Sequence, residues 1–122
     1  MRRLRQHHIS LKNALNGLSW AFTTQPNFSV HLTLSSIALL MAWLFRIELT
    51  EMLVIIMVIV FGLGAEMINT SIEAMTDLIT KEWKQEAKIA KDVAAGMMLL
   101  YAIGALMVGI FIFLPHLIKF IG

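Results

Sequence analysis

The chain has 122 residues, of which 58% are hydrophobic, with a mean hydropathy of +0.76 and a formal net charge of +2. This composition is too apolar for an ordinary soluble domain of the same size, which makes the lipid bilayer its natural solvent. The small charge, with no basic stretch interleaved with aromatic residues, argues against nucleic-acid binding, and the lack of cysteine excludes a disulfide framework or a thiolate metal site.

The first predicted element is an amphipathic helix within residues 1–25. Apolar side chains recur there at helical spacing, at Leu11, Leu15, Leu18 and Phe22. The helix is expected to end at Gln25, because the following Pro26 disfavours a helical conformation at the residue before it and lacks a backbone donor. We expect this helix to lie on the membrane surface.

Three long apolar segments follow, at residues 28–45, 49–79 and 93–118. A hydrocarbon core about 30 Å thick takes roughly 20 helical residues, so each segment is long enough to cross a membrane. The spans must be helices, because the hydrocarbon offers no water to satisfy backbone polar groups. The sequence therefore predicts an all-α membrane protein, a single domain of residues 1–122 with a surface helix and three transmembrane helices.

The distribution of basic residues predicts the orientation of these spans. Eight of the ten precede the first span or separate the second from the third: Arg2, Arg3, Arg5, Lys12, Lys81, Lys84, Lys88 and Lys91. Only Arg46 and Lys119 remain for the other side. Because lysine and arginine favour the cytoplasmic side of a membrane, we expect the N-terminus in the cytoplasm and the C-terminus outside.

Polar side chains form a stripe near the end of the middle span. They are separated by three, four and four residues: Glu66, Asn69, Glu73 and Asp77. At about 100° per residue they fall within a stripe roughly 80° wide on one helix face. Ionisable residues at membrane depth cost about 2.5 to 3.5 kcal/mol each, so function explains the stripe better than exposure to cytoplasmic water alone. A divalent cation would relieve the repulsion, and oxygen donors favour magnesium or manganese.

Lys91 and Asp92 stand at the start of the third span, beside the same interface. A lysine here could neutralise phosphate and the aspartate could orient it, while the alternative for Lys91 is a simple interfacial anchor. The chain has no phosphate-binding loop of the usual kinds, so any nucleotide must be bound in another way. We assign no ligand role to the histidines, and expect His31, which enters the first span, to satisfy a local polar contact.

The run from Glu66 to Asp77, Glu-Met-Ile-Asn-Thr-Ser-Ile-Glu-Ala-Met-Thr-Asp, resembles the signature of the bacterial diacylglycerol kinase and undecaprenol kinase family. Further similarity lies in residues 87–96, 27–31 and 14–17. The resemblance implies a lipid kinase of the bacterial inner membrane, a homotrimer with sites shared between subunits, which uses ATP and Mg²⁺ to phosphorylate a lipid alcohol. The runs 87–96 and 27–31 are more similar to the undecaprenol branch, which favours undecaprenol over diacylglycerol.

The resemblance also assigns roles to single residues. Glu66 would be the general base, supported in catalysis by Asn69 and Asp77, and the lipid would contact Glu66 and Ala95. Glu73 and Gln25 would hold the metal, although the family usually has a glutamate where this chain has Gln25. The ATP site would be lined by Gln25, Glu73, Glu82, Trp83, Lys84, Lys91 and Asp92.

Two other functions are compatible with a carboxylate stripe in a membrane. A small oligomer could conduct protons or a cation, but the carboxylates and Lys91 gather at one surface and residues 97–113 offer no polar relay to the other. A non-catalytic membrane scaffold derived from the kinase is the other alternative, and Gln25 is the residue that favours it.

Overall fold

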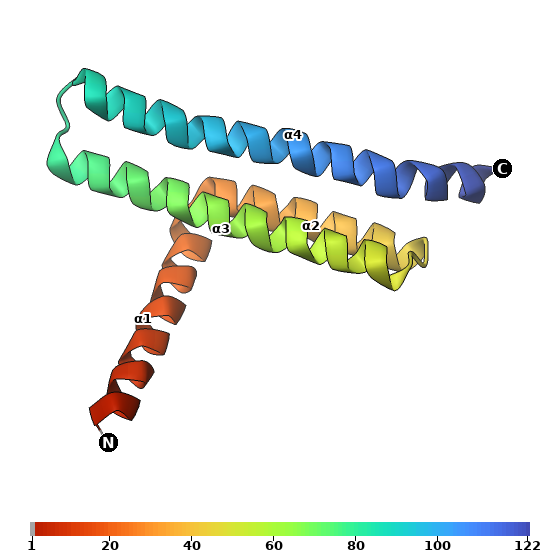
Figure 1. Ribbon diagram of the computed structural model, residues 1–122, viewed down its shortest axis with the longest axis horizontal. Helices are drawn as coiled ribbons and strands as arrows, with labels where there is room; N and C mark the ends of the chain where they lie inside the picture. Colours follow the sequence, from red (N-terminus) through yellow and green to blue (C-terminus); the bar gives the residue numbers. More distant parts are fainter. Residues whose placement is uncertain (1) are drawn as a thin grey trace.

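A computed structural model describes residues 2–122 of the chain, and the side chains of residues 10–122. The described residues form four helices: α1 (Arg2–Thr24), α2 (Pro26–Leu44), α3 (Leu49–Ile79) and α4 (Gln85–Ile121). Helices α2, α3 and α4 run alongside one another, whereas α1 points away from them (Figure 1). Each of the three aligned helices is long and apolar enough to cross a membrane, which confirms the all-α, three-span prediction.

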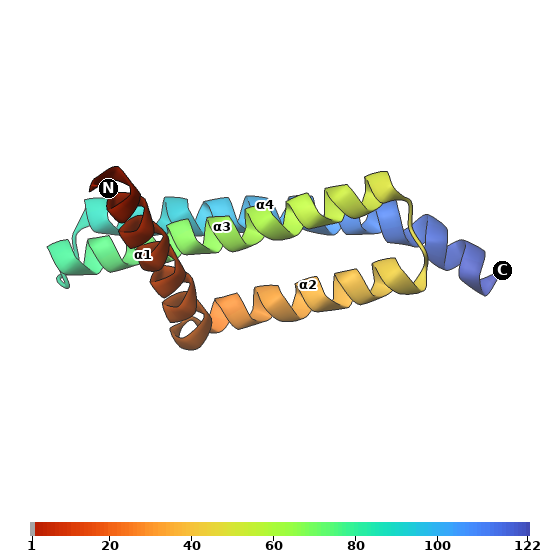
Figure 2. The same cartoon turned by 90° about the horizontal axis from the view of Figure 1, so that it is seen from below.

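The break between α1 and α2 lies at the predicted place. Gln25 has an extended backbone, with φ −101° and ψ 112°, and Pro26 opens α2. Proline is favoured at the first helical position because its missing N–H would have no helical partner there. The resulting corner turns the chain from α1 into the three-helix bundle, as the second view shows (Figure 2). That α1 rests on the membrane surface stays a prediction, and the side chains of Arg2, Arg3 and Arg5 lie outside those described.

The last helix extends beyond the predicted span of residues 93–118. It begins at Gln85 and continues to Ile121, so the connection from α3 is shorter than the charged stretch suggested. Residues 85–92 are mostly polar but favour a helix, and Lys88 pairs with Asp92 one turn later. Hydropathy marks where a helix can enter lipid, not where it begins, so the charged first turns of α4 were missed.

Two contacts lock α3 against α4. The Tyr101 hydroxyl donates a hydrogen bond to the Val58 carbonyl at 2.8 Å, and the ring lies so close to Gly62 that an added Cβ would overlap it. At the far end of the bundle, His116 Nε2 and Glu51 Oε2 are 2.9 Å apart. The first contact lies near the middle of α3 and the second near its start, so the two helices are joined at two separate heights.

Candidate active site

A cavity of about 410 Å³ lies between α2, α3 and α4, and we call it the inner cavity. Four of the predicted site residues line it, Glu66, Asn69, Glu73 and Ala95. Glu66 is 3% exposed and Asn69 6%, whereas Glu73 is exposed. Among the described residues, the Asn69 Oδ1 is buried without a hydrogen-bond partner. Because buried polar atoms are normally paired, this oxygen points to a ligand in the cavity.

Apolar side chains form the rim of the inner cavity. Val30 of α2 and Leu99 of α4 line it and are 56% and 63% exposed. Since both helices are candidate membrane spans, these side chains are suited to contact lipid tails. The inner cavity thus joins a buried carboxylate to a wall that a lipid can approach.

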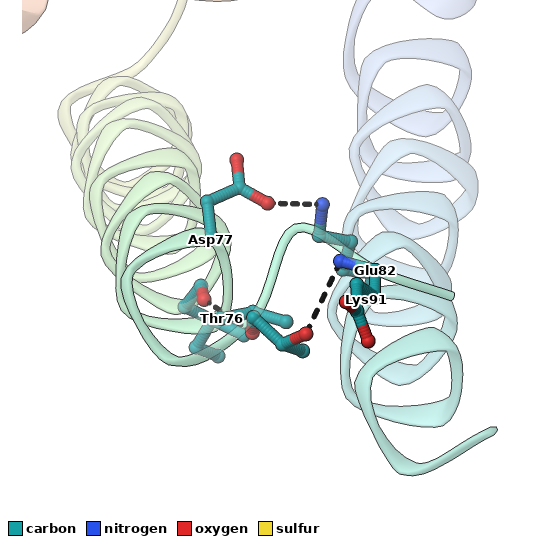
Figure 3. A network of polar contacts seen from close by, with 6 residues as sticks. Thr76, Asp77, Glu82 and Lys91 are labelled. Carbon is teal, nitrogen blue, oxygen red and sulfur yellow. Dashed lines mark hydrogen bonds and ion pairs between the residues drawn. The ribbon is translucent and has the colours of Figure 1, made fainter. Parts of the chain in front are cut away.

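A second cavity of about 340 Å³ lies where α3 ends and α4 begins, and we call it the loop cavity. It is lined by the other predicted residues of this region: Asp77, Glu82, Trp83, Lys84, Lys91 and Asp92. Lys91 Nζ reaches across from α4 to Asp77 Oδ1 of α3 at 2.6 Å, so the two helix ends are tied together (Figure 3). This pair therefore provides the loop cavity with a cation and a carboxylate, and both side chains are partly exposed to water.

Local hydrogen bonds shape the loop that closes this second cavity. Within the loop, the Glu82 backbone N–H donates to Thr80 Oγ1 at 3.1 Å, and just before it, in the last turns of α3, the Thr76 hydroxyl donates to the Ile72 carbonyl (Figure 3). Trp83 is 75% exposed beside them. An exposed indole ring can stack on a planar base, and the lysine side chains beside it can neutralise phosphate charge. Together these groups suit the binding of a nucleotide, which has both a base and phosphates.

The carboxylate stripe of the sequence is therefore divided between two cavities. Glu66, Asn69 and Glu73 line the inner cavity, while Asp77, one turn further along α3, lines the loop cavity. Gln25 lines neither cavity, and its Nε2 donates to Thr24 Oγ1 at 3.1 Å. Its role as a metal and ATP ligand stays a prediction.

His31 and Tyr101 are among the residues of the inner cavity that were not predicted from the sequence. His31 Nε2 lies 3.9 Å from Glu66 Oε2, and the His31 ring packs against that of Tyr101, with 5.7 Å between centroids. A titratable side chain inside an apolar span is itself a signal of function, so His31 could have been singled out. Nothing in the local sequence marks Tyr101.

Comparison with known proteins gives one consistent result. The family described as prokaryotic diacylglycerol kinase matches residues 12–113. A diacylglycerol kinase of Synechocystis sp. is 36% identical over 112 residues, which cover 91% of this chain but only 64% of that protein. An undecaprenol kinase of Bacillus subtilis is 33% identical over 108 residues, covering 88% of each chain. The chain thus spans less than two thirds of the first relative and nearly all of the second.

Proposed function

The chain belongs to the prokaryotic diacylglycerol kinase family, and from that premise we propose that it is an ATP- and Mg²⁺-dependent kinase of a membrane lipid alcohol. The observation that carries the proposal is the inner cavity, which is lined both by the buried Glu66 and by the exposed apolar side chains of Val30 and Leu99. The cation of Lys91 stands further along the same pair of helices, in the loop cavity. Such a reaction requires a site for the lipid alcohol that opens to the bilayer and a site for the nucleotide that opens to water.

In the proposed reaction Glu66 acts on the lipid hydroxyl. The hydroxyl oxygen attacks the γ-phosphorus of ATP, the bond from that phosphorus to the bridging oxygen breaks, and ADP leaves. Glu66 accepts the hydroxyl proton as the new O–P bond forms. Asn69, one turn away on α3, lines the same cavity with an Oδ1 that has no hydrogen-bond partner among the described residues, and it would orient the hydroxyl or a phosphate ligand.

The nucleotide is assigned to the loop cavity. Trp83 offers an exposed ring for the base, and Lys84 and Lys91 offer charge for the phosphates. Asp77 holds Lys91 at 2.6 Å, which keeps the ammonium group between α3 and α4. Glu82 and Asp92 complete this wall, so the phosphate chain would run along α3 from Asp77 toward Glu73.

The oxygen donors of the inner cavity fit a magnesium ion. Glu73 supplies a carboxylate and Asn69 an unpaired amide oxygen, both hard ligands of the kind Mg²⁺ prefers. When bound, Mg²⁺ neutralises phosphate charge. No three histidine or carboxylate side chains within residues 10–122 gather closely enough to hold a metal alone, so phosphate, water or another subunit would complete the set.

Changing the charge of the two proposed metal ligands, Glu73 and Gln25, should shift the Mg²⁺ requirement in opposite directions. Glu73→Gln should raise the Mg²⁺ concentration needed for half-maximal activity, because it removes a negative oxygen ligand. Gln25→Glu should lower that concentration, with lipid affinity unchanged, if Gln25 belongs to the metal shell. Magnesium titrations of the two variants and the unaltered protein test both. An unchanged requirement in either variant would remove that residue from the ligand set.

We further propose a homotrimer in the bacterial inner membrane, with the N-terminus in the cytoplasm. Glu73 is exposed on the single chain and can therefore be reached from a neighbouring subunit. Several apolar side chains of α1, among them Leu11 and Leu15, are exposed as well and would rest on the membrane surface. This orientation puts the loop cavity on the side where ATP is present.

Undecaprenol is the favoured acceptor and diacylglycerol the second. The preference rests on the runs 27–31 and 87–96 and on the undecaprenol kinase relative, which matches this chain over 88% of both lengths. Purified protein in lipid nanodiscs with γ-labelled ATP, Mg²⁺ and a panel of lipid alcohols provides the test. We expect labelled lipid phosphate, most from undecaprenol. If folded protein transfers phosphate to none of these alcohols, the kinase proposal is contradicted and the non-catalytic membrane scaffold is favoured.

A further inference from the structure

The Glu66 carboxylate has one polar neighbour that the reaction as described does not use. Glu66 is 3% exposed, and within residues 10–122 it accepts no hydrogen bond from another side chain. Among the described residues its one ion-pair contact is with His31, whose Nε2 lies 3.9 Å from Glu66 Oε2. A donor stabilises a carboxylate in such a buried position, so a donor group at this distance is significant.

His31 is itself held in place by a chain of contacts. Its ring packs against Tyr101, with the two planes inclined at 44°. Tyr101 is fixed in turn, because its hydroxyl donates to the Val58 carbonyl and its ring fills the space left by Gly62. The imidazole of α2 is thus aimed at Glu66 by a clamp formed between α3 and α4.

We propose that His31 is a positioning residue for Glu66, acting through its Nε2–H. At 3.9 Å the two atoms are beyond direct hydrogen-bond length, and a small side-chain rotation or one bridging water closes the gap. Holding one carboxylate oxygen by the imidazole directs the other toward the inner cavity, where the lipid hydroxyl is expected. The kinetic consequence rests on the proposed kinase function, whereas the pairing itself does not.

Two substitutions separate positioning from packing. His31→Leu substitutes an apolar side chain of similar bulk and so removes the donor. It should lower kcat for lipid phosphorylation by about 10- to 100-fold, the range expected for a misplaced catalytic group. The KM for ATP should stay unchanged, because the loop cavity is untouched. His31→Gln, whose amide can donate from a position close to Nε2, should recover most of the rate.

The chain supplies a matched control for these substitutions. His116 also pairs with a glutamate of α3, Glu51, but does so at the far end of the bundle. His116→Leu removes a histidine–glutamate contact between helices without touching the inner cavity, so its kcat should equal that of the unaltered protein. Equal rates for His31→Leu and His116→Leu, or equal losses in the leucine and glutamine variants of His31, would overturn the positioning role.

A spectroscopic measurement tests the pairing without relying on turnover. In ¹⁵N-histidine-labelled protein in nanodiscs, Glu66→Gln should shift the imidazole nitrogen resonances of His31 and leave those of His116 in place. Unmoved His31 resonances would overturn the inference even if the protein is an active kinase. A clear shift in protein that phosphorylates no lipid alcohol would support the pairing and contradict the kinase, so the two failures are distinguishable.

Discussion

Glu66→Gln is expected to lower the rate of lipid phosphorylation by about 10²- to 10⁴-fold, the usual contribution of a general base. The substitution keeps the shape of a side chain that is 3% exposed, so the loss reports the proton acceptor and not a packing defect. ATP affinity should be nearly unchanged, because the nucleotide is assigned to the loop cavity further along α3. Single-turnover rates and nucleotide binding measured on the same preparation check both parts.

Glu51→Gln is the appropriate comparison for this variant. Glu51 also lies on α3 and faces α4, but it belongs to the far end of the bundle, where it contacts His116. Its substitution should leave turnover intact. Parallel weakening of ATP binding and turnover in Glu66→Gln would assign Glu66 to the nucleotide site and remove it as the base.

Gly62→Ala should destabilise the protein by about 1 to 3 kcal/mol, the usual cost of overpacking a tight interior. The added methyl group would overlap the Tyr101 ring and hydroxyl, so Tyr101 must move and give up its hydrogen bond to the Val58 carbonyl. Since alanine is the better helix former, intrinsic propensity acts in the opposite direction and cannot explain a loss. Thermal unfolding in detergent, followed by circular dichroism, measures the effect.

Gly64→Ala provides the control, because nothing lies within 4 Å of a Cβ at that position on the same helix. We expect it to be neutral or stabilising. Adding Gly62→Ala to Tyr101→Ala should cost little, since the clashing ring is then absent. A full additive loss in the double variant would place the cause of destabilisation elsewhere than the Gly62 to Tyr101 contact.

The architecture was predictable because lipid imposes simple rules on the chain. The middle span of residues 49–79 coincides with α3, since a long apolar run bounded by charged stretches leaves a membrane helix little choice of ends. The Gln25 corner was predictable from proline chemistry alone. The start of α4 was not, because the charged residues before 93 extend the helix in water, where hydropathy gives no signal.

The site was only partly predictable from the sequence. Residues on one helix could be predicted to lie together, whereas contacts between different helices could not. Helical periodicity aligned Glu66, Asn69 and Glu73 on one face of α3, and the structure places all three in the inner cavity. Contacts between residues on different helices leave no periodic pattern in the sequence. The approach of His31 to Glu66 depends on how α2 packs on α3, and the clamp on Tyr101 depends on the register of α3 and α4.

The separation of the two cavities along α3 also bears on how the products leave. Glu66 and Asp77 stand about 16 Å apart along the helix axis, at a rise of about 1.5 Å per residue. In the proposed reaction, a phosphorylated lipid formed at Glu66 would depart sideways past Val30 and Leu99 into the leaflet, while ADP at the loop cavity would depart into water. The lipid product would leave into the bilayer and ADP into water, by separate exits. Release of one product would therefore not depend on release of the other, and no lid would have to open during turnover.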